Sequence, residues 1–268
     1  MSQTTTVSFR PDGYECGGRW ARSAVGLLAL QIAVGGVMLY LENATLQAAH
    51  SMAVAARYPV APELIDRYAA AAGPLWLLYC LQTALVLVTL VPFLVWVYRT
   101  HRNASALGAR RDSPKPAWAV AYFLIPVVNL ATPYRVMWTT WRASIPAARG
   151  SRSARRIALG GVLLIGGWWL AFAASTLLTA AAAGTVCEAL AETRGDAMVV
   201  QHMQSLALLS MAATAAAVLS YLLTILVIAG LERLQRARFA MLTPTCGEDG
   251  ANSAARAITE VFILEATP

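Results

Sequence analysis

Charged residues are scarce in this sequence, and that scarcity argues against a soluble globular domain. Of its 268 residues, 13% are charged and 58% are hydrophobic. A soluble domain of this length carries about twice that charged fraction. The hydrophobic residues are also gathered into long runs, which is the pattern of membrane-spanning helices.

Residues that carry common chemistry are also few. The three histidines are isolated, and the sequence contains no HExxH, GxSxG or GxxxxGK motif. The cysteines lie far apart without a CxxC pair, so we expect neither a disulfide framework nor a structural zinc site; they are Cys16, Cys80, Cys187 and Cys246. The sequence therefore predicts no enzyme, no cofactor and no metal.

Four apolar runs are long enough to cross a bilayer, since about 17 residues suffice. None of them contains Asp, Glu, Lys, Arg or His. They cover about residues 24–41, 74–98, 157–183 and 205–229. The first run would also suit a signal peptide, but its apolar core exceeds the usual length of about 7–15 residues. We interpret it as an uncleaved membrane anchor.

Basic residues are distributed unevenly between the connections. Eighteen of the twenty-one lie in residues 1–22, in residues 99–156 or after residue 229. The connections at 42–73 and 184–204 hold the other three, together with six acidic residues. Because basic loops stay in the cytoplasm, this placement predicts two transmembrane hairpins with both termini cytoplasmic. It also argues against nucleic acid as a partner, since the basic residues form no separate domain.

The expected protein is thus an all-α polytopic membrane protein. Its membrane domain covers residues 23–238, and its cytoplasmic tails cover residues 1–22 and 239–268. The threading leaves the apolar stretch 116–134 on the cytoplasmic side, so that stretch must enter and leave the membrane by the same face. A competing threading has five spans and makes 116–134 a true crossing, but it would place six arginines outside.

Prolines are expected to break the element at 116–144. A helix from Pro116 would be interrupted at Pro126, because proline lacks a donor and clashes with the preceding turn. Asn129 could satisfy freed backbone groups, and Thr132 with Pro133 predicts the start of a new helix. The alternative is a kinked transmembrane helix followed by an interfacial turn.

The helix that begins at Thr132 is expected to lie in the headgroup plane. Tyr134, Met137, Trp138 and Trp141 fall on one face, whereas Arg135, Thr139 and Arg142 fall on the other. Solvated flanks are one interpretation of these arginines and their neighbours. The sharper hypothesis is an anionic-lipid site formed by Arg135, Arg142, Arg149, Arg152, Arg155 and Arg156.

Polar and small residues inside the spans are expected to serve helix packing. The polar ones either bond between helices or line a pathway; they are Gln31, Gln82, Ser210, Thr214, Ser220 and Thr224. The third span carries paired glycines at 160–161 and 166–167, which suit close helix contacts.

At residues 96–144 the sequence resembles the bacterial membrane family catalogued as domain of unknown function 4328. The matching pieces are Trp96, Tyr98–Arg99, Arg102–Asn103, Ser113–Pro114, Trp118–Ala119, Ile125–Pro126, Asn129–Leu130, Pro133 and Trp141–Arg142–Ala143–Ser144. The resemblance implies a polytopic, bacterial membrane protein, and it carries over no catalytic role. We expect its location to be the bacterial cytoplasmic (inner) membrane. It makes a candidate functional motif of Trp96, Arg99, Arg102, Asn103, Trp118, Pro126, Asn129, Pro133, Trp141 and Arg142.

Two functional hypotheses follow. The first is a non-catalytic integral membrane protein that acts through helix packing and contacts at its cytoplasmic face, with anionic lipids, a second copy or another membrane protein as partner. The second is a transporter or channel with a passive or lipid-handling pathway near Pro126–Asn129, because broken helices often mark such pathways.

Overall fold

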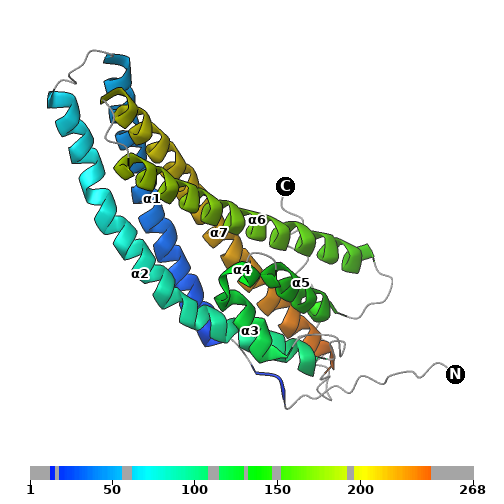
Figure 1. Ribbon diagram of the computed structural model, residues 1–268. Helices are drawn as coiled ribbons and strands as arrows, with labels where there is room; N and C mark the ends of the chain where they lie inside the picture. The colour runs from blue at the N-terminus through cyan, green and yellow to red at the C-terminus, as the bar shows by residue number, and fades with distance from the viewer. Residues whose placement is uncertain are drawn as a thin grey trace. The chain divides into compact units, whose positions relative to one another are not determined.

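The computed structural model describes residues 13–15, 18–55, 62–107, 115–129, 132–146, 152–191 and 196–242, and its regular elements there are helical. The long helices are α1 (Gly18–Ala55), α2 (Pro62–Ala106), α6 (Arg152–Ala191) and α7 (Asp196–Leu242) (Figure 1). Each contains one of the four expected spans and is long and apolar enough to cross a membrane. The chain therefore has the architecture of an all-helical, multi-pass membrane protein.

The long helices extend well beyond the expected spans. Helix α1 has 38 residues, or about 57 Å, which exceeds the hydrocarbon thickness of about 30 Å. The expected outer connection at 42–73 begins inside this helix, because no glycine or proline interrupts the sequence between Gly36 and Pro59. As a result Glu42 is a helical residue, and it is buried.

The element at 116–144 is broken, as the prolines predict, but it forms three short helices where two are expected. These are α3 (Pro116–Leu124), α4 (Pro126–Asn129) and α5 (Thr132–Ser144). The break falls at Ile125, whose φ of −90° and ψ of 112° are extended, the conformation that a following proline favours. With nine residues, α3 is about 13 Å long, less than half the hydrocarbon thickness.

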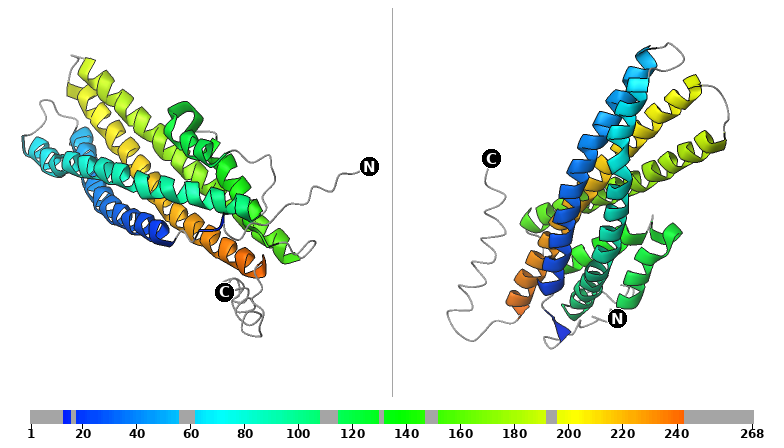
Figure 2. Two further views of the ribbon diagram at one scale, coloured as in Figure 1. Left: turned by 90° about the horizontal axis from the view of Figure 1, so that it is seen from below. Right: turned by 90° about the vertical axis from the view of Figure 1, so that its left-hand side faces the viewer.

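The chain divides into two compact units. Unit 1 comprises residues 1–25, 90–167 and 224–268, and unit 2 comprises residues 26–89 and 168–223. Unit 1 includes the three short helices, which both views of Figure 2 draw as one group. Each long helix thus contributes one segment to each unit.

In unit 2, α1 contributes a regular buried seam. Its buried residues alternate at spacings of three and four, as at a coiled-coil interface; they are Leu28, Gln31, Gly35, Met38, Glu42, Thr45, Ala49 and Met52. Gly35 allows close approach to α7, since a Cβ there would lie 2.5 Å from Cγ2 of Val218. Gly35 therefore serves helix contact, although it is not one of the paired glycines expected to do so from the sequence. Of those, Gly160 and Gly166 make no close contact, because a Cβ at either position would meet no atom within 4 Å.

Three of the polar residues expected inside the spans, Gln31, Gln82 and Thr214, bond between helices of unit 2. Ser210 instead donates to the Ala207 carbonyl within α7. The Gln31 amide donates to Thr89 Oγ1 at 2.6 Å, which joins α1 to α2. The Gln82 amide donates to the Tyr221 hydroxyl at 3.2 Å, which joins α2 to α7. Thr214 Oγ1 donates to Glu42 at 2.8 Å, which joins α7 to α1.

Candidate functional site

The first residue of the 96–144 motif, Trp96, joins α2 to α7 within unit 1. Its side chain is fully buried, and its indole Nε1 donates to Oε1 of Glu232 at 3.1 Å. The other carboxylate oxygen accepts from Arg236, one helical turn later, at 3.3 Å. Both oxygens of the buried carboxylate are thereby satisfied, which offsets its desolvation.

Asn103 and two arginines of the motif bind the segment before α1. The Asn103 amide accepts from the Glu15 backbone N–H at 3.0 Å and donates to the Glu15 carbonyl at 2.8 Å. This reciprocal pair resembles one rung of an antiparallel sheet. The Glu15 carboxylate lies 3.6 Å from Arg99 and 3.0 Å from Arg102. Three motif residues therefore share one partner.

Gln235 of α7 completes a polar cluster with α2 and α5. Its amide nitrogen donates to the Thr100 carbonyl at 2.8 Å and to Ser144 Oγ at 3.3 Å, while its oxygen accepts from Asn103 at 3.3 Å. Nearby, His101 Nδ1 lies 2.9 Å from Thr140 Oγ1. Helix α5 is thus bonded directly to the last turns of α2.

The C-terminal end of α5 is bound by an arginine side chain of α7. Arg238 donates to the carbonyls of Ala143 and Ile145, the latter at 3.2 Å. The last carbonyls of a helix have no partner within it, and a cationic donor there also suits the helix dipole. The motif's closing residues are therefore fixed against α7.

Trp141 packs where two glycines leave room for its ring. Its side chain is buried, and its Nε1 donates to the Ile157 carbonyl of α6 at 3.2 Å. A Cβ at Gly161 would overlap the indole nitrogen, and a Cβ at Gly230 would lie 2.7 Å from the six-membered ring. The indole accordingly links α5 to both α6 and α7.

The other motif residues lie outside this cluster. Trp118 is 55% exposed on α3, and Arg142 is exposed on α5, with its guanidinium 5.7 Å from the centre of the Trp138 ring. Asn129 is half-buried at the end of α4, with its backbone N–H bonded to Ile125. Pro126 begins α4, and Pro133 is buried in the first turn of α5. The motif thus separates into the residues of this cluster and a second group of mixed exposure.

Sequence reasoning missed the partners of this cluster, which are Glu15, Glu232, Gln235 and Arg238. One signal was available, because Leu231, Glu232, Leu234 and Gln235 are all buried and share one helical face. Two polar residues on an apolar face predict buried hydrogen bonds. Glu15 carries no comparable signal, because it lies outside the apolar runs.

A family model described as Domain of unknown function (DUF4328) matches residues 61–233. The chain belongs to this family. The DUF4328 region includes the whole 96–144 motif and Glu232, whereas Glu15, Gln235 and Arg238 lie outside it. No curated protein and no solved structure matches the chain.

The DUF4328 region also carries the exposed arginines of the proposed lipid site. Helix α5 exposes Arg135, Thr139 and Arg142, as its sequence predicts. On the expected apolar face Met137 and Trp141 are buried, whereas Tyr134 and Trp138 are half-buried. At the start of α6, Arg152, Arg155 and Arg156 are exposed as well. Within the described part of the chain, none of these five arginines forms a salt bridge. Arg149 lies outside the described residues.

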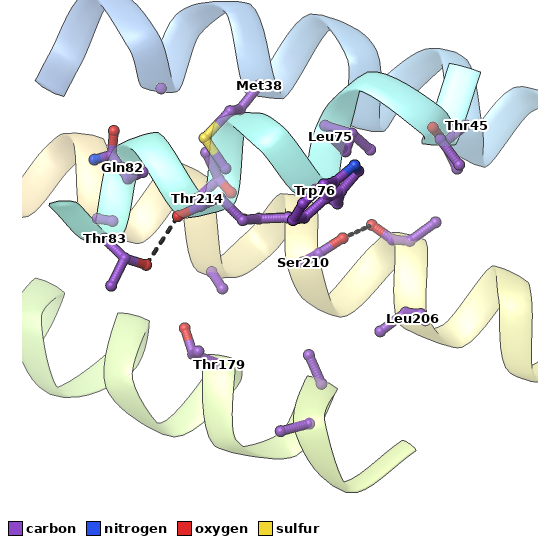
Figure 3. Close-up of a pocket in the computed structure, with 18 of the residues that line it drawn as sticks. Met38, Thr45, Leu75, Trp76, Gln82, Thr83, Thr179, Leu206, Ser210 and Thr214 are labelled. Atoms are coloured by element: carbon purple, nitrogen blue, oxygen red, sulfur yellow. Dashed lines mark hydrogen bonds between the residues drawn. The ribbon is translucent and has the colours of Figure 1, made fainter. Parts of the chain in front are cut away.

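A cavity of about 640 Å³ lies in unit 2 between segments of α1, α2, α6 and α7 (Figure 3). Its lining is mostly apolar, with hydroxyl and amide groups that include Gln82, Ser210 and Thr214. All three belong to the polar residues expected from the sequence either to bond between helices or to line a pathway, whereas Asn129 does not line this cavity.

Proposed function

We propose that this protein is a non-catalytic integral membrane protein of the bacterial cytoplasmic membrane, acting through a basic cytoplasmic face formed by unit 1. The partition of charge carries this proposal. Unit 1 contains 18 basic and 8 acidic residues, whereas unit 2 contains 3 basic and 6 acidic residues. A compact unit with such an excess of basic over acidic residues is expected on the cytoplasmic side of the membrane.

The same partition supports a four-span threading. Unit 1 gathers the segments expected in the cytoplasm, and unit 2 gathers both acidic connections. The hydrogen bond between Thr140 and His101 supports it further, because α5 follows α3 and α4 yet contacts the end of α2 that precedes them. A true crossing needs about 20 helical residues, and α3 has nine. On this proposal, residues 116–129 return to the face they enter.

Cysteine labelling in intact cells tests the threading. In a variant with all four native cysteines replaced by serine, single cysteines at Asp112 and Ser151 should both resist a membrane-impermeant maleimide until the cells are opened. A cysteine at exposed His50 should label from outside. External labelling of Ser151 with protection of Asp112 would instead support five spans.

Anionic lipid is the partner that the exposed arginines favour. The acids described in unit 1, Glu15 and Glu232, already pair with Arg99, Arg102 and Arg236. The arginines of α5 and of the first turns of α6 are therefore available to bind anions outside the chain. Each basic residue near an anionic membrane surface contributes about 1 kcal/mol to the free energy of binding. A second copy or another membrane protein with an acidic face is the competing partner.

The lipid proposal is tested by neutralising six arginines, which are Arg135, Arg142, Arg149, Arg152, Arg155 and Arg156. The glutamine variant should lose the enrichment of phosphatidylglycerol over phosphatidylcholine in lipid that co-purifies with the protein. It should also lose the rise in unfolding temperature that added phosphatidylglycerol causes. A variant with lysine at the same six positions keeps the charge and should keep both effects. Equal enrichment in the glutamine variant would exclude the lipid site.

A further inference from the structure

Glu42 in α1 is a buried acid whose hydrogen bonding is incomplete. It is 1% exposed, and its Oε1 accepts from the Tyr79 hydroxyl at 2.6 Å and from Thr214 Oγ1 at 2.8 Å. Its Oε2 is buried and has no hydrogen-bond partner among the described residues. A buried carboxyl with one unpaired oxygen is costly, so such a group calls for a functional explanation.

The described residues of unit 2 supply no cation to Glu42. Arg67 is their only Lys or Arg side chain; it is exposed on α2 and forms no ion pair with another described residue. Unit 1 differs here, because its buried Glu232 pairs with Arg236. A cation from outside the chain would balance the charge of Glu42.

The cavity of unit 2 lies against this acid. Both hydrogen-bond partners of Glu42, Tyr79 and Thr214, line it, and so do Met38 and Thr45, one turn to either side of Glu42 on α1 (Figure 3). Glu42 is not itself part of the lining. In its ionised form Glu42 would attract a cation in the cavity, because it is hydrogen-bonded to two residues of the lining and lies in surroundings of low polarity.

Aromatic rings supply the other contacts that a cation prefers. Tyr68, Trp76, Tyr79 and Tyr221 all line the cavity. The face of an aromatic ring attracts cations, and such rings form the usual cages for ammonium groups. The hydrogen bond from Tyr79 to a carboxylate adds electron density to its ring, which strengthens that attraction.

We propose that the cavity of unit 2 binds an organic cation with an apolar body. The cationic group lies among the aromatic rings on the Glu42 side, and the apolar body fills the rest of the cavity, where alanine, valine and leucine side chains predominate. The negative charge of Glu42 would repel an anion. A neutral apolar molecule would leave that negative charge without a counter-charge. The site is separate from the basic face of unit 1, so either proposal can fail alone.

Binding of radiolabelled tetraphenylphosphonium tests this site. The full chain is placed in phosphatidylcholine nanodiscs, so that anionic lipid does not retain the probe. Saturable binding is expected, whereas tetraphenylborate, of similar size and opposite charge, should neither bind nor compete. Glu42→Gln should weaken phosphonium binding by about tenfold or more, which corresponds to about 1.4 kcal/mol. Glu232→Gln removes a buried acid from unit 1 and should leave binding unchanged.

A second variant separates the site from the fold. Ala183 is exposed and lines the cavity from α6, so Ala183→Trp should fill it and abolish binding while the protein keeps its unfolding temperature. The proposal is overturned if the wild type shows no saturable binding, if both ions bind alike, or if Glu42→Gln or Ala183→Trp binds as tightly as the wild type.

Discussion

Units 1 and 2 use segments of the same four long helices, but their buried carboxyl and amide side chains differ in how completely they are hydrogen-bonded. In unit 1, the buried carboxylate of Glu232 has a donor at each oxygen, and Asn103 and Gln235 both have several partners. In unit 2, Glu42, Gln31 and Gln82 each keep one buried oxygen without a partner among the described residues.

The two units also differ in how they use small residues. In unit 1, Gly161 and Gly230 are covered by the indole of Trp141. In unit 2, several small residues of α6 and α7 line an open cavity, among them Ala183, Ala213 and Ala217. Small residues therefore do not predict tight packing by themselves, because a large side chain must also be present to fill the space they leave.

The largest effect on stability is expected at Trp141, whose side chain packs between α5, α6 and α7 in unit 1. Trp141→Ala should lower the free energy of unfolding by about 3 kcal/mol, because it leaves a cavity between α5, α6 and α7. Reversible unfolding in mixed micelles measures this change. Trp118→Ala is the matched control: it removes an equally large side chain that is 55% exposed, and it should change stability by less than about 0.5 kcal/mol. Equal losses would mean that Trp141 does not hold unit 1 together.

Larger side chains on α6 are expected to have an intermediate effect on stability. The size of the loss should depend on whether the substituted residue lies in unit 1 or in unit 2. Gly161→Leu collides with the indole of Trp141 and should cost about 2 kcal/mol. Ala183→Leu on the same helix enters the cavity of unit 2 and should change stability by less than about 0.5 kcal/mol.

Gly160→Leu controls for the change in helix propensity. A Cβ at Gly160 meets no atom within 4 Å, so its replacement should leave stability unchanged or raise it slightly. The thermal unfolding midpoints of the three variants give the ranking. If Gly160→Leu were as harmful as Gly161→Leu, contact with Trp141 could not be the cause.

The smallest effect is expected at the surface of unit 1. Glu15→Gln removes the ion pairs with Arg99 and Arg102 but keeps the backbone bonds to Asn103, so it should cost less than about 1 kcal/mol. The difference from the wild type should shrink in 1 M salt, where such pairs are screened. A larger, salt-independent loss would show that the carboxylate does more than pair with these arginines.

Much of the fold could be predicted because its signals are local. Apolar runs of sufficient length lie within all four long helices, and Pro126 breaks the helix at the residue before it. The exposed and buried faces of α5 follow from helical periodicity, with Arg135 and Arg142 on the exposed side. Each of these features depends on neighbours within a turn or two of helix.

The candidate sites could be predicted only in part. The motif at 96–144 contains Trp96, Asn103 and Trp141, but their partners lie far along the chain: Glu232 is 136 residues from Trp96, and Glu15 is 88 residues from Asn103. The sequence places Glu42 in a connection, because the apolar run ends at Leu41. The helix continues past that point, and its buried seam includes Glu42.

The sequence by itself determined the four apolar helices, the break at Pro126 and the uneven distribution of basic residues. These follow from composition, from the geometry of proline and from charge, which act along the chain without reference to distant residues. The tertiary structure decided which polar groups became partners. It gave Glu232 a tryptophan and an arginine, and it buried Glu42 beside a cavity with one oxygen unpaired. Such pairings depend on which helix faces pack together, and helices of similar apolar composition do not specify that individually.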